Sequence, residues 1–214
     1  MEVQVWSDVS VAVQTVLATA KVITAISKDS PAEVSSTSHG FSNGAYVLIK
    51  CKGLRDADYL VGRVANTASG TFELEGIDST DWKGTFVSGT AELITFGAEF
   101  ATLQDVSPSG GESADVAVST IHNSQDGSIP GNFTPLVMSH GSIRDVADPG
   151  LIECRKASKV KGIRAVRYTF AEGNVMVFAG YPSTSLAPGG SAGGIVTTSL
   201  KFNVKGLLCD LEAA

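Results

Sequence analysis

Residues 196–205 read Val196-Thr197-Thr198-Ser199-Leu200-Lys201-Phe202-Asn203-Val204-Lys205, and they decide the fold class. Apolar side chains such as Leu200, Phe202 and Val204 alternate with polar ones along the whole stretch. A period of two is typical of a β-strand with one buried and one wet face. We therefore expect a strand here and a mainly β protein around it.

The same alternation recurs upstream, over residues 3–13 and 94–106. Residues 168–170 and 175–178 flank the turn formers Gly173 and Asn174, which predicts a β-hairpin. Residues 181–194 are rich in Gly and Pro and predict a long loop before the last strand.

One segment favours a helix, from Ala114 to Asn123. Ser113 can cap it, and acidic residues lie near its positive end. Its apolar residues follow the spacing of a helix face that packs on a sheet: Ala114, Ala117, Val118 and Ile121.

Residues 22–93 have short apolar runs and closely spaced turns, such as Asn43-Gly44 and Ser69-Gly70. Their two ends should lie close together, as the ends of an inserted domain must. We expect a small β-barrel domain over 22–93, inserted into a main domain of residues 1–21 and 94–214.

Composition excludes several classes of protein. With 43% hydrophobic residues in 214, wholesale disorder is excluded, and the 23 Gly show no collagen period. No apolar run approaches the roughly 20 residues of a membrane-spanning helix, and the acidic N-terminus is unlike a secretory signal. The three cysteines are far apart and are expected to be buried free thiols.

The net charge of −6 disfavours nucleic-acid binding overall. One local basic cluster has no acid within it: Arg155, Lys156, Lys159, Lys161, Arg164 and Arg167. Because interleaved aromatic residues are absent, a solvated loop or inter-subunit salt bridges are favoured over a phosphate backbone as its role.

No pattern predicts catalysis. His39, His122 and His140 lack a metal-binding spacing, and no G-x-S-x-G stretch is present. A hydrolase using serine, His122 or His140 and Asp145 is a weak alternative, because nothing constrains their spacing. The sequence predicts no enzyme, no metal and no cofactor.

Residues 167–206 resemble the C-terminal half of major tail tube proteins from phages with long, non-contractile tails. The shared pattern is a hairpin around Gly173 that leads through a loop into the last strand, with Ala171 where the family commonly has proline. The helix expected from Ala114 to Asn123, followed by Ile129-Pro130-Gly131, is similar to the family's short helix and the stretch after it. Residues 22–93 resemble an SH3-like β-barrel module found in many phage structural proteins.

This resemblance implies a tail-tube-type β-sandwich or barrel with one flanking α-helix. It implies a structural virion protein, assembled in the host cytoplasm into hexameric rings that stack as a hollow tube for the genome. The implied partners are copies of the chain, the tape measure, tail tip and terminator proteins, and double-stranded DNA in transit without specific binding. No membrane is involved.

The resemblance also directs attention to particular residues. Glu99 and Asp105 are expected to face the channel, because carboxylates repel DNA phosphates, with the basic cluster facing away and residues 22–93 on the exterior. Loops 104–111 and 181–194 are expected to reach neighbouring subunits. Their candidate contact residues are Gln104, Pro108, Gly110, Gly111, Tyr181, Pro188, Gly190 and Gly194. The alternative function is a receptor- or carbohydrate-binding β module of the virion, which exposed aromatic pairs on loops would favour.

Overall fold

The computed structural model describes residues 6–122, 127–185 and 187–213. Within them the chain is mainly β with a single helix, α1 (Pro149–Val160), so the expected fold class is confirmed. The helix is 12 residues long, and no helix in the described part is long and apolar enough to cross a membrane. The strands are β1 (Ser10–Leu17), β2 (Lys21–Ile23), β3 (Ala25–Ile26), β4 (Ala32–Ser35), β5 (Tyr46–Leu54), β6 (Leu60–Ala65), β7 (Thr71–Leu74), β8 (Gly84–Glu99), β9 (Leu103–Ser109), β10 (Ser113–Val118), β11 (Gly127–Phe133), β12 (Val137–Ile143), β13 (Arg164–Thr169), β14 (Val175–Thr184) and β15 (Thr197–Leu211).

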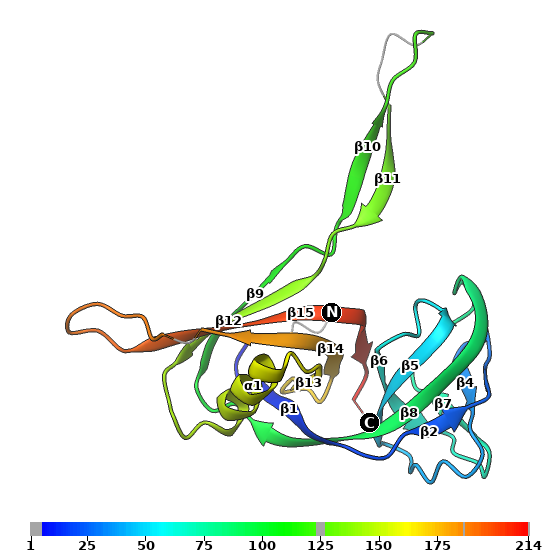
Figure 1. Ribbon diagram of the computed structural model, residues 1–214, viewed down its shortest axis with the longest axis horizontal. Helices are drawn as coiled ribbons and strands as arrows, with labels where there is room; N and C mark the ends of the chain where they lie inside the picture. The colour runs from blue at the N-terminus through cyan, green and yellow to red at the C-terminus, as the bar shows by residue number, and fades with distance from the viewer. Residues whose placement is uncertain (1–5, 123–126, 186, 214) are drawn as a thin grey trace.

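One continuous sheet joins most strands in the order β3-β4-β7-β6-β5-β8-β1-β13-β14-β15-β12-β9, and β2 pairs with β8 beside this path. The long strand β8 pairs with β5 and, toward its end, with β1. It therefore connects the small unit around β2–β7 to the main sheet, and it runs through residue 93. Figure 1 shows the small unit at one end of the body, with the ribbon β10–β11 projecting away from it.

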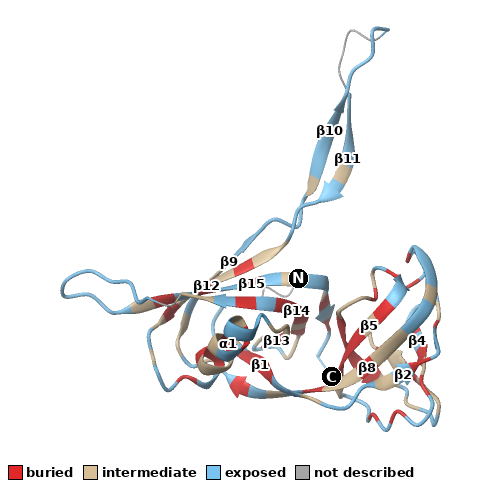
Figure 2. Ribbon diagram, viewed as in Figure 1, coloured by how far each residue is buried: buried red, intermediate tan, exposed pale blue. Residues whose placement is uncertain are grey.

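Two hydrophobic clusters stabilise the body. The larger contains the small unit's Phe72 and Trp82 and extends to Val177 and Leu211 of the main sheet. The other lies between the main sheet and α1, and includes Phe178 and Cys154. Figure 2 shows buried residues in both parts of the body, whereas the projecting ribbon is exposed.

The expected helix over 114–123 is wrong. Residues Ser113–Val118 form β10, antiparallel to β11, and Asn123 lies outside the described residues. The apolar spacing also fits a strand, since β-branched Val116 and Val118 lie two residues apart and favour extended backbone. Because Ser113–Val118 pairs with β11, the segment is a strand and not a helix.

The helix instead occupies part of the basic stretch, so the expected loop there is also wrong. Asp148 caps α1 by accepting a hydrogen bond from the Leu151 amide, Pro149 lies in its first turn, and Lys161 ends it in a left-handed conformation. Its buried residues place an apolar face on the sheet: Gly150, Leu151, Cys154 and Ala157.

Other strand predictions differ in extent. The hairpin around Gly173 and the strand through Phe202 are confirmed as β13–β14 and β15. The first strand begins at Ser10, and residues 3–5 lie outside the described residues. The stretch 94–106 divides between β8 and β9, because Asp148 binds the Ala101 amide at 2.9 Å and holds the chain in a bend.

Candidate assembly surfaces

The ribbon β10–β11, with residues 119–122, forms an arm that leaves the body (Figure 1). Its large apolar side chains are exposed, with Ile121 at 97% and Phe133 at 77%. Val116 and Ile129, opposite each other in the ribbon, are exposed too. Because an isolated two-stranded ribbon is at best marginally stable in water, an arm of this composition is typical of a segment that packs on another subunit.

Two expected contact residues, Gly110 and Gly111, lie at the base of this arm. Both have positive φ, +78° and +81°, which a side chain would strain. A Cβ on Gly110 would also lie 2.1 Å from the Pro135 carbonyl oxygen. Glycine is therefore needed where the chain turns from β9 into the arm.

Gln104 and Pro108 were expected in a loop, and this placement is wrong, because both lie in strand β9. Within the described residues β9 pairs only with β12, so its other margin is a sheet edge. Open edges are sites where a further strand can add.

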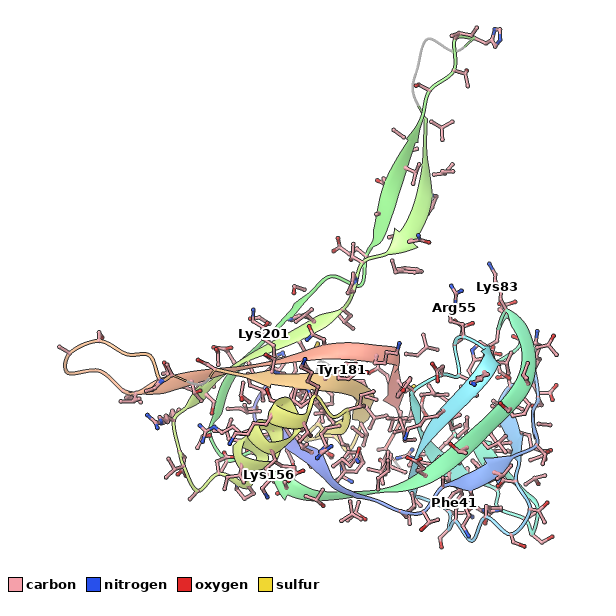
Figure 3. All side chains as sticks on the ribbon, in the orientation of Figure 1. Phe41, Arg55, Lys83, Lys156, Tyr181 and Lys201 are labelled. Carbon is pink, nitrogen blue, oxygen red and sulfur yellow. The ribbon has the colours of Figure 1, made fainter. Side chains whose placement is uncertain are left out.

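The loop after β14 is shorter than expected. Pro188, Gly190 and Gly194 lie in it as predicted, but Tyr181 belongs to β14. Figure 3 shows Tyr181 on that strand and Lys201 on its neighbour β15. The loop projects from the body (Figure 1), and its base is closed by Gly189 pairing with Thr197.

Glu99 and Asp105 are both exposed. Strand register places Glu99 opposite Ala12 and Asp105 opposite Gly141. Following the pairings across β13, β14 and β15 puts both acids on one sheet face, opposite the one that α1 covers. Asp105 also has a structural role, since its Oδ1 accepts a hydrogen bond from the Gly141 amide at 2.8 Å.

The basic residues of 155–167 do not form one patch. Arg164 pairs with Glu153, with Nη2 2.9 Å from Oε1, and ties β13 to α1. The Arg167 guanidinium lies 5.0 Å from the centre of the Phe96 ring, a cation–π contact. Arg155 and Lys159 instead line a hollow together with Arg144, which comes from a different part of the chain.

Histidines and cysteines are dispersed. His39 is buried in the small unit, His122 is exposed on the arm, and His140 is buried in the main core. In the described ranges no three potential metal ligands come together. The cysteines are buried and free, as expected, and burial raises the pKa of each thiol.

A mainly β body with a long, exposed apolar arm is the architecture of a structural protein that assembles with others. The family model of the phage tail tube protein (TTP) matches residues 55–212, which is most of the chain. The chain therefore belongs to the phage tail tube protein family. A search of curated proteins gives no match.

Membership of this family confirms the expectation of a structural protein of the phage tail. The family is one of structural proteins of the phage tail and is not an enzyme family. The matched residues include β9, the arm and β15, and they begin within the segment 22–93.

Proposed function

We propose that this protein forms hexameric rings, and that the rings stack into the tube through which the phage genome passes into the host. The single observation that carries the proposal is the exposed arm. Fully burying a large apolar side chain contributes roughly 1.5–3 kcal/mol. An arm carrying Ile121, Phe133 and the valines of β10 gains that stabilisation only beside another subunit.

The lateral contacts of the ring involve the open margin of β9. A sheet edge that would promote uncontrolled aggregation in a monomer becomes a specific contact when a neighbour's strand covers it. The contact is head-to-tail, and a head-to-tail contact with the right rotation closes into a ring. The arm and the loop of residues 185–196 then reach further copies.

Glu99 and Asp105 line the bore in this arrangement. Their shared sheet face supports this assignment, because one face of the sheet can carry both carboxylates toward the DNA, together with the exposed Lys201 of β15. Carboxylates keep the duplex from binding, whereas cations would neutralise phosphates and retain it.

A tail tube also implies where the protein assembles, which proteins it assembles with and where residues 22–93 lie. Assembly takes place in the host cytoplasm together with the tape measure, tail tip and terminator proteins. The tail is of the long, non-contractile type. Residues 22–93 act as an inserted module on the exterior, where it least disturbs ring closure.

Electron microscopy of the purified protein at rising concentration, combined with mass photometry, tests the proposal. We expect rings with the mass of six subunits, and tubes at the highest concentrations. A monodisperse monomer at every concentration would contradict assembly and would favour the alternative, a receptor- or carbohydrate-binding module.

A further inference from the structure

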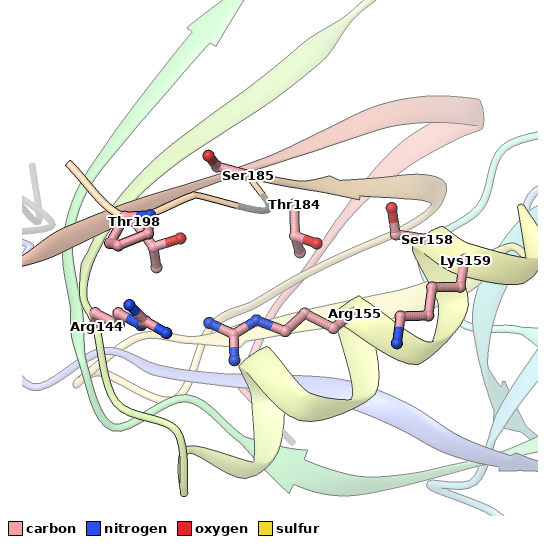
Figure 4. Close-up of a pocket in the computed structure, with 8 residues that line it drawn as sticks. Arg144, Arg155, Ser158, Lys159, Thr184, Ser185 and Thr198 are labelled. Carbon is pink, nitrogen blue, oxygen red and sulfur yellow. The ribbon is translucent and has the colours of Figure 1, made fainter.

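A basic hollow of about 430 Å³ lies beside α1. Figure 4 shows Arg155 and Lys159 projecting into it from the helix and Arg144 from the segment before it. Pro188 and four hydroxyl-bearing residues complete the lining: Ser158, Thr184, Ser185 and Thr198.

The charged groups of this hollow have no counterions within the described residues. Arg144, Arg155 and Lys159 take part in none of the chain's ion pairs, and no acidic residue lines the hollow. The guanidinium groups of Arg144 and Arg155 extend toward each other (Figure 4). Like charges placed together repel unless an anion lies between them.

A second observation is that, among the described residues, one hydroxyl group at the hollow lacks a hydrogen-bond partner. The Thr184 hydroxyl is buried and makes no hydrogen bond in the described structure. Buried polar groups are normally hydrogen-bonded, and an unpaired one costs free energy. An oxygen anion in the hollow would pair with the guanidinium groups and lie beside Thr184.

The arm of the same chain has the opposite charge pattern. No lysine or arginine occurs between Lys83 and Arg144, whereas the arm carries Asp115 and Glu112 directly precedes it. Neither of these carboxylates takes part in an ion pair of the described structure.

Asp115 lies on the polar face of the ribbon. On that face Pro130 lies directly opposite Asp115, Ala117 lies opposite Ser128, and Ser113 lies opposite Phe133. Val116 and Ile129 share the other face. Asp115 is exposed, so its carboxylate is available to a neighbouring subunit on the ribbon face opposite Val116 and Ile129.

We propose that the hollow lined by Arg144, Arg155 and Lys159 receives the Asp115 carboxylate from the arm of a second copy of this chain. The contact is between subunits, because the arm projects away from its own body (Figure 1). This inference rests on the proposed function, in which the arm reaches a neighbouring subunit, and it identifies the surface that the arm meets.

Charge exchange between the two sides tests the proposal. Arg155→Glu and Asp115→Arg, each alone, should raise the protein concentration needed for assembly about tenfold or more, because each leaves like charges facing one another. The double variant, with both substitutions in one chain, should assemble better than Asp115→Arg alone, because the two introduced charges attract one another, but less well than wild type, because Arg144 and Lys159 remain cationic. Thermal melting of each variant by circular dichroism verifies that the monomer is folded.

Two controls separate this contact from general charge effects. Lys156→Glu changes a cation of the same helix that does not line the hollow, and Glu172→Arg changes an exposed acid in the β13–β14 turn. Both should assemble as wild type does.

The outcomes are distinguishable. If wild type assembles and Arg155→Glu assembles equally well, or if the double variant is no better than Asp115→Arg alone, this inference is wrong while the proposed function stands. If wild type never assembles, both are wrong. If wild type binds inorganic phosphate or duplex DNA, and Arg155→Glu abolishes that binding without affecting assembly, the hollow is a phosphate site and the proposal is overturned.

Discussion

His140 Nε2 and the Tyr168 hydroxyl form a hydrogen bond inside the main core, where both side chains are buried. The other ring nitrogen of His140, Nδ1, has no partner in the described structure. Burial lowers the pKa of His140 from 6.5 to about 4, and the backbone of Met138, the charge of Asp105 and the backbone of Leu200 oppose this only in part. The imidazole is therefore neutral in the folded protein at pH 7.

This burial predicts a stability loss on acidification. Between about pH 6.5 and pH 4 the unfolded chain binds a proton at His140 that the folded chain does not, so the free energy of unfolding falls by about 3 kcal/mol from this residue. Urea unfolding from pH 4 to 7.5 measures it. His140→Phe, which cannot titrate, should show a pH dependence smaller by about that amount. An unchanged pH dependence would contradict a neutral buried histidine.

Asp148 is a second buried polar residue with several partners. Its carboxylate caps α1 and also accepts hydrogen bonds from the Ala101 amide and the Thr102 hydroxyl. Asp148→Ala should lower the free energy of unfolding by about 2–3 kcal/mol. Asp145→Ala, which removes one local hydrogen bond to the Ala147 amide, should cost under about 1 kcal/mol. If Asp148→Ala and Asp145→Ala lowered the free energy of unfolding equally in chemical denaturation, the hydrogen bonds of Asp148 would contribute no more than the single local one of Asp145.

Gly206 brings β15 against the residues that precede β6. Its φ is +82°, and a Cβ would lie 2.7 Å from the Tyr59 carbonyl oxygen. Gly206→Ala should therefore destabilise the fold by about 2 kcal/mol or more. Gly193→Ala is the matched control, because its φ is +78° but nothing lies near its Cβ position. It should cost about 1 kcal/mol or less, and thermal melting compares the two.

The arm's apolar residues should matter for assembly and not for the monomer. Ile121→Ser with Phe133→Ser should leave the melting temperature within about 2 °C of wild type, because both side chains are already exposed. The same variant should form no tubes by electron microscopy. Val87→Ser, at a position on β8 that is 72% exposed, is the control and should assemble normally. Normal assembly of the arm variant would exclude the arm as a contact.

Reversing the proposed bore acids should make the tube retain DNA. Tubes of Glu99→Lys with Asp105→Lys should bind duplex DNA in a salt-dependent way, whereas wild-type tubes should not. Sedimentation of tubes with labelled DNA measures the retention, and DNA release from phage carrying the variant measures its consequence. Glu33→Lys, in the small unit, should not retain DNA. Absence of retention in the double variant would remove these acids from the bore.

The sequence predicts strands well where one face is wet. Leu200 and Phe202 alternate with lysine and asparagine because β15 has one buried face, and that pattern is visible without a structure. The arm was missed because no core imposes a pattern on it. Its partner strand contains Pro130 and Gly131, which by themselves indicate a turn.

Helix α1 was missed for a different reason. Its many cationic residues make the short apolar stripe of Leu151, Cys154 and Ala157 difficult to recognise in the sequence. A signal was nevertheless present, because Asp148 followed by Pro149 is a typical helix start.

The basic hollow has no sequence signature. Arg144 precedes the helix, Arg155 lies within it, and Thr184 is at the end of β14. Only the sheet order brings these residues together, so a run of cations in the sequence indicates charge but not a site.

In the proposed tube, a neighbouring subunit covers the apolar side chains of the arm. Cryo-electron microscopy of the assembled wild-type protein tests this most directly. We predict rings of six in which Ile121 and Phe133 of each arm are buried against another copy. A tube whose arms extend freely into solvent would contradict the account.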